Sequence, residues 1–501
     1  MLTHLSDQIL RIFKYILIYG CIFLPFVMLA QTISQKRGLA YNISKTTDLS
    51  SLTQGVSWFY NWDIQPKSSI VNNYQTYNLD FVPMSWNGSF NQNTLKTFLQ
   101  SHPKVKYLLG FNEPNFKSQA NMKPSEAASQ WKDLEIIADQ YNLKLVSPAV
   151  NYCSTTDAVT ENGITYTDPV QYLDDFFKAC PNCRVDYIAV HCYMNYASAL
   201  QSYIAKFKKY NKPIWLTEFC GWESGITPTI QRTLMVKAVD YLENDSAVFR
   251  YSWFNSSNTG SPYMQILQGD TFGSLTEMGN IYVNMSSCDS SYYFNTGATI
   301  PACQYRRMSG VLLEQTTDIS GSIDVCDFTS GESLDYNVVI PSAGSYLFSF
   351  RVAAATAASL TLLMDGKSIG SQAIAPTGSF QTWLTQTNCF NLSSGNHTIR
   401  LQLSSGAICL NWWSITAISS GFIHEILDTV RLSPNPVSQL LNIHLPDPQC
   451  EVALLNVFGK TLWQKHGATE ILMNPYSDGC YIVQITLPNG VRKMYKIIKK
   501  N

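Results

Sequence analysis

The sequence predicts an α/β fold, a (β/α)8 barrel, followed by an all-β sandwich of jelly-roll type and a small C-terminal β-sandwich domain. Between about residues 37 and 285, eight short apolar runs alternate with longer amphipathic stretches. After about Ser286, short alternating strands are separated by glycine-rich turns. The 501 residues are also too many for one ordinary domain and fit about three.

The N-terminus, residues 1–30, is expected to be a signal peptide. Arg11 and Lys14 precede an apolar run that ends at Ala30. The run is short for a spanning helix, which needs about twenty residues, so we expect cleavage after Ala30, with a retained membrane anchor as the alternative. A lipid attachment site at Cys21 is disfavoured because the bulky Tyr19 stands where small residues are usual.

The predicted barrel rests on buried strands that alternate with helices. The eight apolar runs are RGLAYN, GVSWFYNW, DFVPMSW, KYLLGFNEP, LKLVSPAVN, DYIAVHCYM, PIWLTEFC and VFRYSWFN. Between them, apolar residues recur at helical spacing, as in the stretch SEAASQWKDLEIIADQYN after Pro124. A doubly wound open sheet also alternates in this way, but no glycine-rich nucleotide turn follows the first run. In such a barrel the active site lies at the carboxyl ends of the strands.

Composition excludes some classes of function. The formal net charge of −1 gives no electrostatic argument for nucleic acid or an anionic membrane. Aromatic residues make up 13% of the chain and suit stacking on flat apolar ligand faces.

Cysteine usage predicts disulfides rather than a metal site. Twelve of the 13 cysteines follow Ala30, and an exported protein is expected to pair most of them. Zinc binding by Cys180 and Cys183 with His191 and Cys192 is disfavoured. The last two are neighbours on a predicted strand and would point to opposite faces. We therefore predict no metal and no cofactor.

Two carboxylates end predicted strands and are the candidate catalytic residues. Glu113 ends the fourth run, where Pro114 lacks the amide that would continue a strand, and Glu218 ends the seventh. A carboxylate pair at one barrel mouth can hydrolyse a glycoside, one as acid and base and the other as nucleophile or water activator. Alternatively, either glutamate is a salt-bridge partner. Glu223, in the following loop, is the rival carboxylate.

Other polar and aromatic residues at the strand ends are candidate substrate contacts. His191 could hydrogen-bond the nucleophile or a sugar hydroxyl, or could be a capped structural histidine. The tryptophans could be stacking platforms for sugar rings or could pack the core between sheet and helices. The candidates chosen as substrate-binding are Trp58, Tyr60, Trp86, Asn112, His191, Tyr193 and Trp253.

Residues 37–285 resemble the catalytic core of glycoside hydrolase family 128, also called the Asl1-like family. The motifs that carry the resemblance are GVSWFYNW, FVPMSW, YLLGFNEPN, LVSPAVN, DYIAVHCYM and PIWLTEF. The resemblance implies a secreted retaining β-1,3-glucanase on a TIM barrel, with Glu113 as acid/base and Glu218 as nucleophile. It also implies that Asn112, His191, Tyr193 and the tryptophans line the glucan cleft.

Residues 295–417 resemble a family 6 carbohydrate-binding module through MSGVLLE, AGSYLFSFRVA, TGSFQTW and LNWW. The resemblance implies that Trp383 and Asn411 contact sugar. Two positions depart from the pattern. Asp327 stands where a second stacking aromatic is usual, and Cys303 stands where an acidic residue usually helps bind structural calcium. A plain sandwich that only spaces the catalytic domain is the alternative.

The last unit, residues 428–501, resembles the C-terminal sorting domain of type IX secretion. LSPNP, LLNVFGK and DGCYIVQI occur in that family's order before a lysine-rich end, and the unit holds no catalytic cluster. The resemblance implies export across the outer membrane of a Bacteroidetes-like bacterium by the type IX machinery, followed by removal of the tail.

The sequence as a whole therefore predicts a secreted or cell-surface endo-β-1,3-glucanase whose substrate is a polysaccharide. We expect no nucleic-acid partner and, after cleavage of the signal peptide, no association with a membrane. A retaining hydrolase of another β-glycan, such as mannan or mixed-linkage glucan, is one alternative. A non-catalytic surface glycan-binding protein is another, and the presence of both glutamates disfavours it.

Overall fold

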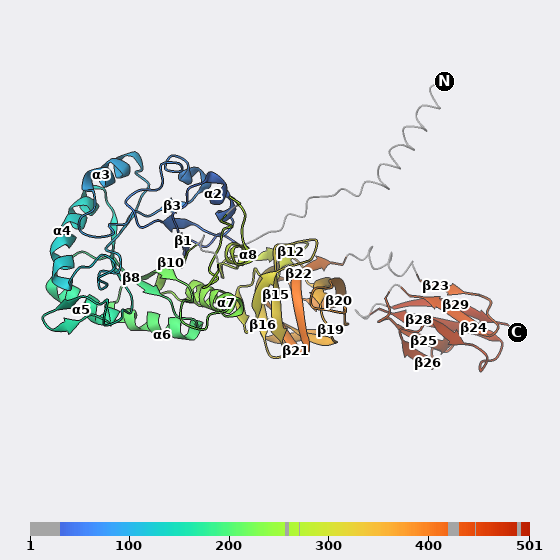
Figure 1. The fold of residues 1–501 in the computed structure, drawn as a ribbon. Helices are drawn as coiled ribbons and strands as arrows, with labels where there is room; N and C mark the ends of the chain where they lie inside the picture. Colours follow the sequence, from blue (N-terminus) through green and yellow to red (C-terminus); the bar gives the residue numbers. More distant parts are fainter. Residues whose placement is uncertain are drawn as a thin grey trace, which may run out of the picture.

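The computed structural model describes residues 31–255, 260–269, 271–418, 430–445, 447–487 and 492–500. Three units follow one another along the chain, named here the parallel-sheet domain, the sandwich domain and the C-terminal domain (Figure 1). The expected signal peptide lies outside the described residues. Among the residues that are described, no helix combines the length and apolarity needed to cross a membrane.

The parallel-sheet domain contains eight strands in the order β3-β2-β1-β10-β9-β8-β5-β4, so the predicted set of eight parallel strands is confirmed. After β3, a parallel bridge between Met84 and Leu109 connects the chain to β4, and the sheet curls with helices on its outside (Figure 1). The strands are β1 (Arg37–Ala40), β2 (Trp58–Tyr60), β3 (Asp80–Phe81), β4 (Tyr107–Leu109), β5 (Lys144–Val150), β8 (Tyr187–Cys192), β9 (Ile214–Phe219) and β10 (Val248–Phe254).

Helices follow most strands of this domain. Helix α4 begins with Pro124, and the Glu126 side chain caps it by accepting a hydrogen bond from Lys123 N at 3.0 Å. Its Trp131 ring packs edge-on against Phe176 at 5.4 Å, which joins α4 to α5. The helices are α2 (Thr46–Leu52), α3 (Gln92–Ser101), α4 (Pro124–Gln140), α5 (Pro169–Ala179), α6 (Ala197–Phe207), α7 (Pro228–Asn244) and α8 (Glu277–Asn284). Short elements are the 3-10 turns η1 (Tyr74–Tyr77) and η2 (Lys208–Tyr210) and the hairpin β6 (Thr160–Glu161) and β7 (Ile164–Thr165).

The amino ends of the strands are filled by aromatic rings around one cation. The Arg250 guanidinium lies over the rings of Trp58, Tyr107 and Trp215, at 5.4, 4.9 and 5.2 Å from their centroids. Its charge is paired with Asp80 at 2.8 Å. These rings and the ion pair occupy the amino ends of the strands, and in a barrel of parallel strands the substrate site lies at the opposite, carboxyl ends.

The sandwich domain consists of two antiparallel sheets, as the alternating pattern predicts. Their strand orders are β11-β16-β21-β18-β19, joined by β13, and β14-β15-β22-β17-β20, joined by β12. Trp413 lies in the core between them and stacks on Phe348 at 6.0 Å. The strands are β11 (Phe294–Asn295), β12 (Thr299–Pro301), β13 (Arg307–Ser309), β14 (Leu312–Gln315), β15 (Ile323–Thr329), β16 (Ser333–Ile340), β17 (Gly344–Ala353), β18 (Ala358–Met364), β19 (Lys367–Ile374), β20 (Leu384–Leu392), β21 (Gly395–Ser405) and β22 (Ala407–Ala417).

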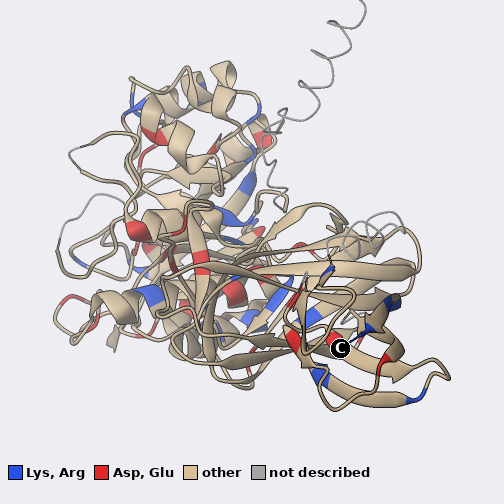
Figure 2. Cartoon of the chain, turned by 90° about the vertical axis from the view of Figure 1, so that its right-hand side faces the viewer, with Lys and Arg blue, Asp and Glu red and all other residues tan. Residues whose placement is uncertain are grey.

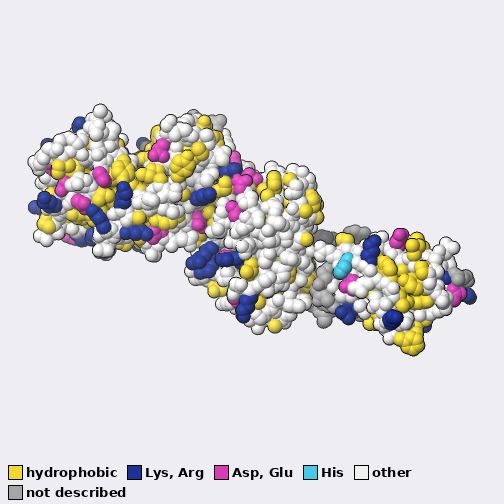
Figure 3. Space-filling view, turned by 90° about the horizontal axis from the view of Figure 1, so that it is seen from below, with side chains coloured by type: hydrophobic (Ala, Val, Ile, Leu, Met, Phe, Trp, Pro, Cys, Tyr) yellow, Lys and Arg dark blue, Asp and Glu magenta, His cyan; other side chains and the backbone are white. Residues whose placement is uncertain are grey.

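The C-terminal domain has a core of its own and two sheets, ordered β23-β24-β27 and β26-β25-β28-β29. Hydrophobic side chains gather on one of its faces in Figure 3, and Phe458 is 91% exposed. Along the ribbon in Figure 2, acidic and basic residues are interspersed over the described parts of the chain. The strands are β23 (Arg431–Ser433), β24 (Leu440–His444), β25 (Glu451–Asn456), β26 (Thr461–His466), β27 (Glu470–Leu472), β28 (Gly479–Thr486) and β29 (Arg492–Lys499).

The cysteines differ from the expectation of a disulfide-rich protein. Within the described part of the chain, Cys180 and Cys183 form a disulfide after α5, and ten other cysteines are free thiols. The prediction of mostly paired cysteines is wrong because, apart from Cys180 and Cys183, the cysteine sulfurs of the described residues do not come within bonding distance of one another. The C-x2-C pair is itself a disulfide and therefore offers no thiolates to a zinc ion.

Candidate active site

Glu113 is placed by a sharp turn immediately after β4. Its φ of 40° lies in the left-handed region, which is uncommon for a residue with a side chain and often found at functional sites. The backbone holds this conformation on both sides, because Glu113 N donates to Ala149 O at 2.8 Å and Glu113 O accepts from Phe116 N at 2.9 Å. Gly110, just before this turn, lets the backbone pass close to the Trp131 ring, since a Cβ at this position would lie 2.7 Å from that ring.

Glu218 lies near the carboxyl end of β9 and accepts hydrogen bonds at both oxygens. Oε1 accepts from the Tyr60 hydroxyl at 2.8 Å and from Trp62 Nε1 at 2.7 Å, while Oε2 accepts from the Tyr193 hydroxyl. Burial, together with the charge of Glu113, raises the pKa of Glu218 overall, while the His191 charge and the hydrogen bonds from Tyr193 and Trp62 act in the opposite direction. The three donors favour the ionised carboxylate that a nucleophile requires.

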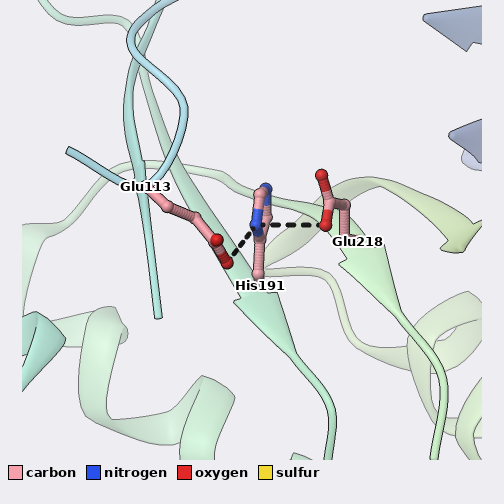
Figure 4. A group of neighbouring side chains, drawn as sticks. All are labelled: Glu113, His191 and Glu218. Atoms are coloured by element: carbon pink, nitrogen blue, oxygen red, sulfur yellow. Dashed lines mark hydrogen bonds and ion pairs between the residues drawn. The ribbon is translucent and has the colours of Figure 1, made fainter. Parts of the chain in front are cut away.

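His191, on β8, lies between the two glutamates (Figure 4). Its Nδ1 is 3.0 Å from Glu113 Oε1 and 3.3 Å from Glu218 Oε2. One oxygen from each glutamate and the histidine nitrogen all lie within 4.8 Å of one another. Burial lowers the pKa of His191, but the two carboxylates outweigh burial, so the pKa is raised overall. A protonated His191 would place a positive charge between two negative ones.

A cavity of about 430 Å³ opens beside Glu113. Trp222 is 47% exposed on its wall, and its ring lies 5.7 Å from that of Phe254. Asn151 reaches in from the end of β5 and donates to Glu113 Oε1 at 3.2 Å. Aromatic walls with a few polar groups are typical of sugar-binding sites. The lining residues are Glu113, Phe116, Gln119, Asn151, Tyr152, Tyr193, Trp222, Glu223 and Phe254.

Five of the residues selected from the sequence lie together in this site, namely Glu113, Glu218, His191, Tyr60 and Tyr193.

Asn112 and Trp86 lie beside them without touching either carboxylate among the contacts described. Asn112 donates from its side chain to Gln119 Oε1 at 3.3 Å and from its backbone to Trp86 O at 2.9 Å. Its Oδ1 is buried without a partner among the described residues. The Trp86 side chain is half-buried.

Trp58 and Trp253 do not form the predicted stacking platforms for sugar rings, because both side chains are completely buried. Trp58 is the first residue of β2, so it lies at the amino end of the sheet, where its Nε1 donates to Lys36 O at 2.9 Å. Trp253 packs edge-on against Phe219 at 5.0 Å and donates to Met264 O at 2.8 Å. Neither ring offers a face to a sugar, so the core-packing alternative holds for both.

The sequence selection missed Trp62, Asn151, Trp222 and Phe254. Trp62 was recognisable, since it follows Tyr60 by two residues at the same strand end. Asn151 ends the fifth apolar run much as Asn112 ends the fourth. Trp222 and Phe254 carry no such signal, because loop and strand-end geometry decides whether an aromatic ring faces the cleft. The rival carboxylate Glu223 lines the cavity, but its Oε2 accepts from Asn195 N at 2.9 Å.

In the sandwich domain, Trp383 and Asn411 are buried rather than open to a ligand. Both bind the loop between β14 and β15, Trp383 Nε1 through the Thr317 hydroxyl at 3.4 Å and Asn411 Nδ2 through Asp318 Oδ2 at 2.8 Å. Asp318 also pairs with Arg351 at 2.7 Å. The two side chains that were expected to contact sugar therefore contact this loop instead. Asp327, in the place of the second aromatic, is exposed.

Comparison with known families divides the chain into the same three units. Residues 38–282 match the glycosyl hydrolase catalytic core family, residues 301–417 the family 6 carbohydrate binding modules, and residues 431–500 the secretion system C-terminal sorting domains.

Individual relatives match parts of the chain. Alkali-sensitive linkage protein 1 of Schizosaccharomyces pombe is 30% identical over 274 residues, which are 50% of this chain and 45% of that protein. The clotting factor G alpha subunit of Tachypleus tridentatus is 32% identical over 123 residues, 24% of this chain and 18% of that protein. The chain thus spans less than half the length of either. A solved family 128 (subgroup II) endo-β-1,3-glucanase from Pseudomonas viridiflava is 39% identical, with 50% of this chain and 98% of that one covered and a TM-score of 0.46.

Proposed function

We propose that this chain, a glycoside hydrolase of the glycosyl hydrolase catalytic core family, is an exported endo-β-1,3-glucanase that retains the anomeric configuration. One observation carries the mechanism: oxygens of Glu113 and Glu218 lie within 4.8 Å of each other, on either side of His191. Carboxyl groups about 5–5.5 Å apart accompany retention, whereas inversion needs about 6.5–9.5 Å to admit a water molecule. The spacing therefore supports double displacement.

In the first step, Glu113 protonates the leaving glycosidic oxygen while Glu218 attacks the anomeric carbon, and the glycosidic bond breaks as the glycosyl–Glu218 ester forms. In the second step, Glu113 takes a proton from water, the hydroxide attacks the anomeric carbon, and Glu218 leaves as a carboxylate. The donors Tyr60, Trp62 and Tyr193 support Glu218 as the nucleophile. Asn151 and His191 orient Glu113.

The choice of β-1,3-glucan rests on the family 128 motif set of the parallel-sheet domain, and the aromatic cavity wall suits a glucan chain. The sorting domain supports export by type IX secretion to the cell surface or the medium. The sandwich domain would then help the enzyme to bind polysaccharide. Trp383 and Asn411 could contact sugar only after the loop between β14 and β15 has moved away from them.

The test is hydrolysis of laminarin by Glu113→Gln and Glu218→Gln. Each variant is expected to lose essentially all activity while its circular dichroism spectrum stays unchanged. Glu223→Gln is the matched control, since this carboxylate lines the cavity but is bound by Asn195, and it should keep most of the activity. Wild-type activity in either catalytic variant would refute the assignment. A panel of β-glucans, mannan and mixed-linkage glucan included, then tests the linkage.

A further inference from the structure

The sandwich domain contains a cluster of three metal-ligating side chains, remote from the glycosidase residues in sequence. Glu314 lies on β14, Asp324 on β15 and Cys409 on β22, three strands that are neighbours in one sheet. Glu314 and Asp324 are direct partners across β14 and β15. One ligand atom from each of the three residues lies within 4.8 Å of the other two.

Asp324 is the unusual member of this cluster. Its side chain is 0% exposed, and neither of its carboxylate oxygens has a hydrogen-bond partner among the described residues. A buried carboxylate without a partner is strongly disfavoured and must either be protonated or hold a cation.

Glu314 and Cys409, the other two members of the cluster, also have the surroundings expected of metal ligands. Gln381 Nε2 donates to Glu314 Oε1 at 2.6 Å, and Arg232 of α7 lies 3.5 Å from Glu314 Oε2. Such outer contacts orient a metal-binding carboxylate. Cys409 is buried and free, so its sulfur is available as a thiolate once a metal displaces the proton.

We propose that Glu314, Asp324 and Cys409 bind one zinc ion, which joins β14, β15 and β22 on the side of the module that packs against α7. Two carboxylates and a thiolate suit zinc, which accepts sulfur and oxygen ligands in tetrahedral geometry. Calcium and magnesium take oxygen ligands, so the thiolate selects against both. Three protein ligands leave a fourth position for water. Cys303, at the position where related modules carry a calcium-binding acid, is outside the cluster.

Cobalt(II) is the probe, because it enters zinc sites and gives a thiolate-to-cobalt charge-transfer absorption only when a cysteine is bound. The full chain is stripped with a chelator, handled under nitrogen without a reductant so that the Cys180–Cys183 disulfide stays intact, and titrated with Co²⁺ at pH 7.5. The thiolate band should saturate at about one Co²⁺ per chain and disappear when Zn²⁺ is added. The band separates this site from Glu113, His191 and Glu218, which include no thiol.

Variants identify the ligands. Cys409→Ser should abolish the band, and Glu314→Gln, at a half-buried position that tolerates change, should weaken Co²⁺ binding about tenfold or more. Cys389→Ser, at a half-buried cysteine outside the cluster, and Glu218→Gln should both leave the band intact. The proposal is overturned if the wild-type chain shows no thiolate band, as a protonated Asp324 would give, or if the band survives in Cys409→Ser.

Discussion

Removing one hydrogen-bond donor from Glu218 should shift the pH dependence of catalysis by a calculable amount. Tyr60→Phe deletes the hydroxyl that lies 2.8 Å from Glu218 Oε1 and keeps the buried ring, which contacts Trp62 at 5.5 Å. A hydrogen bond to a charged group contributes about 1.5–3 kcal/mol, and one pKa unit corresponds to about 1.36 kcal/mol. The pKa of Glu218 should therefore rise by about one to two units.

The sign of the activity change follows from the role of Glu218, which must be ionised to attack. A higher pKa means that the carboxylate is lost at a higher pH, so the acid limb of kcat/KM should move up by about one to two pH units. Initial rates on laminarin across the pH range measure this limb. Tyr172→Phe is the control, because its buried hydroxyl donates at 2.8 Å to the carbonyl of Met122 instead. An unmoved limb in Tyr60→Phe, or an equal shift in the control, would refute the reasoning.

Three further substitutions test packing and the cleft. Arg37→Met should lower the free energy of unfolding by about 3–5 kcal/mol, because Glu243, paired with it at 3.1 Å, would stay buried without this cation, although it keeps the hydrogen bond from the Tyr251 hydroxyl. A decrease below about 1 kcal/mol in denaturant unfolding would contradict this expectation. Trp222→Ala should raise KM for laminarin about two- to tenfold, the equivalent of about 0.5–1.5 kcal/mol of stacking, whereas Tyr196→Ala, an exposed tyrosine outside the cavity, should not. Trp58→Ala should destabilise the fold by about 3–5 kcal/mol and leave KM unchanged. A raised KM would instead indicate that Trp58 contacts the substrate.

The strands were predictable because each is an apolar run bounded by polar residues, and all eight runs contain a strand of the parallel sheet. Glu113 and Glu218 were recognisable for the same reason, since a carboxylate that ends a buried run has few structural uses. The sequence does not show the contact of His191 with both glutamates. A register shift between β8 and β9 sets His191 opposite Glu218, and such irregularities leave no trace in a periodic pattern.

The tryptophans and cysteines mark the limit of sequence reasoning. Trp58 and Trp62 differ by four residues, yet one is buried at the amino end of the sheet and the other binds Glu218 at the carboxyl end. Residue type alone does not separate a core ring from a ligand platform. Cysteine pairing likewise depends on which sulfurs meet in space, and export alone wrongly suggested many disulfides. The cluster of Asp324 and Cys409 was invisible for the same reason, since strands distant in sequence bring it together.

The stereochemistry of hydrolysis tests the two-glutamate mechanism most directly. Proton NMR spectra recorded during the first minutes of laminari-oligosaccharide hydrolysis distinguish the newly formed anomers before mutarotation mixes them. With Glu113 and Glu218 acting as acid/base and nucleophile, and with one oxygen of each within 4.8 Å of the other, the β-anomer should appear first. First appearance of the α-anomer would mean inversion and would contradict the covalent role of Glu218.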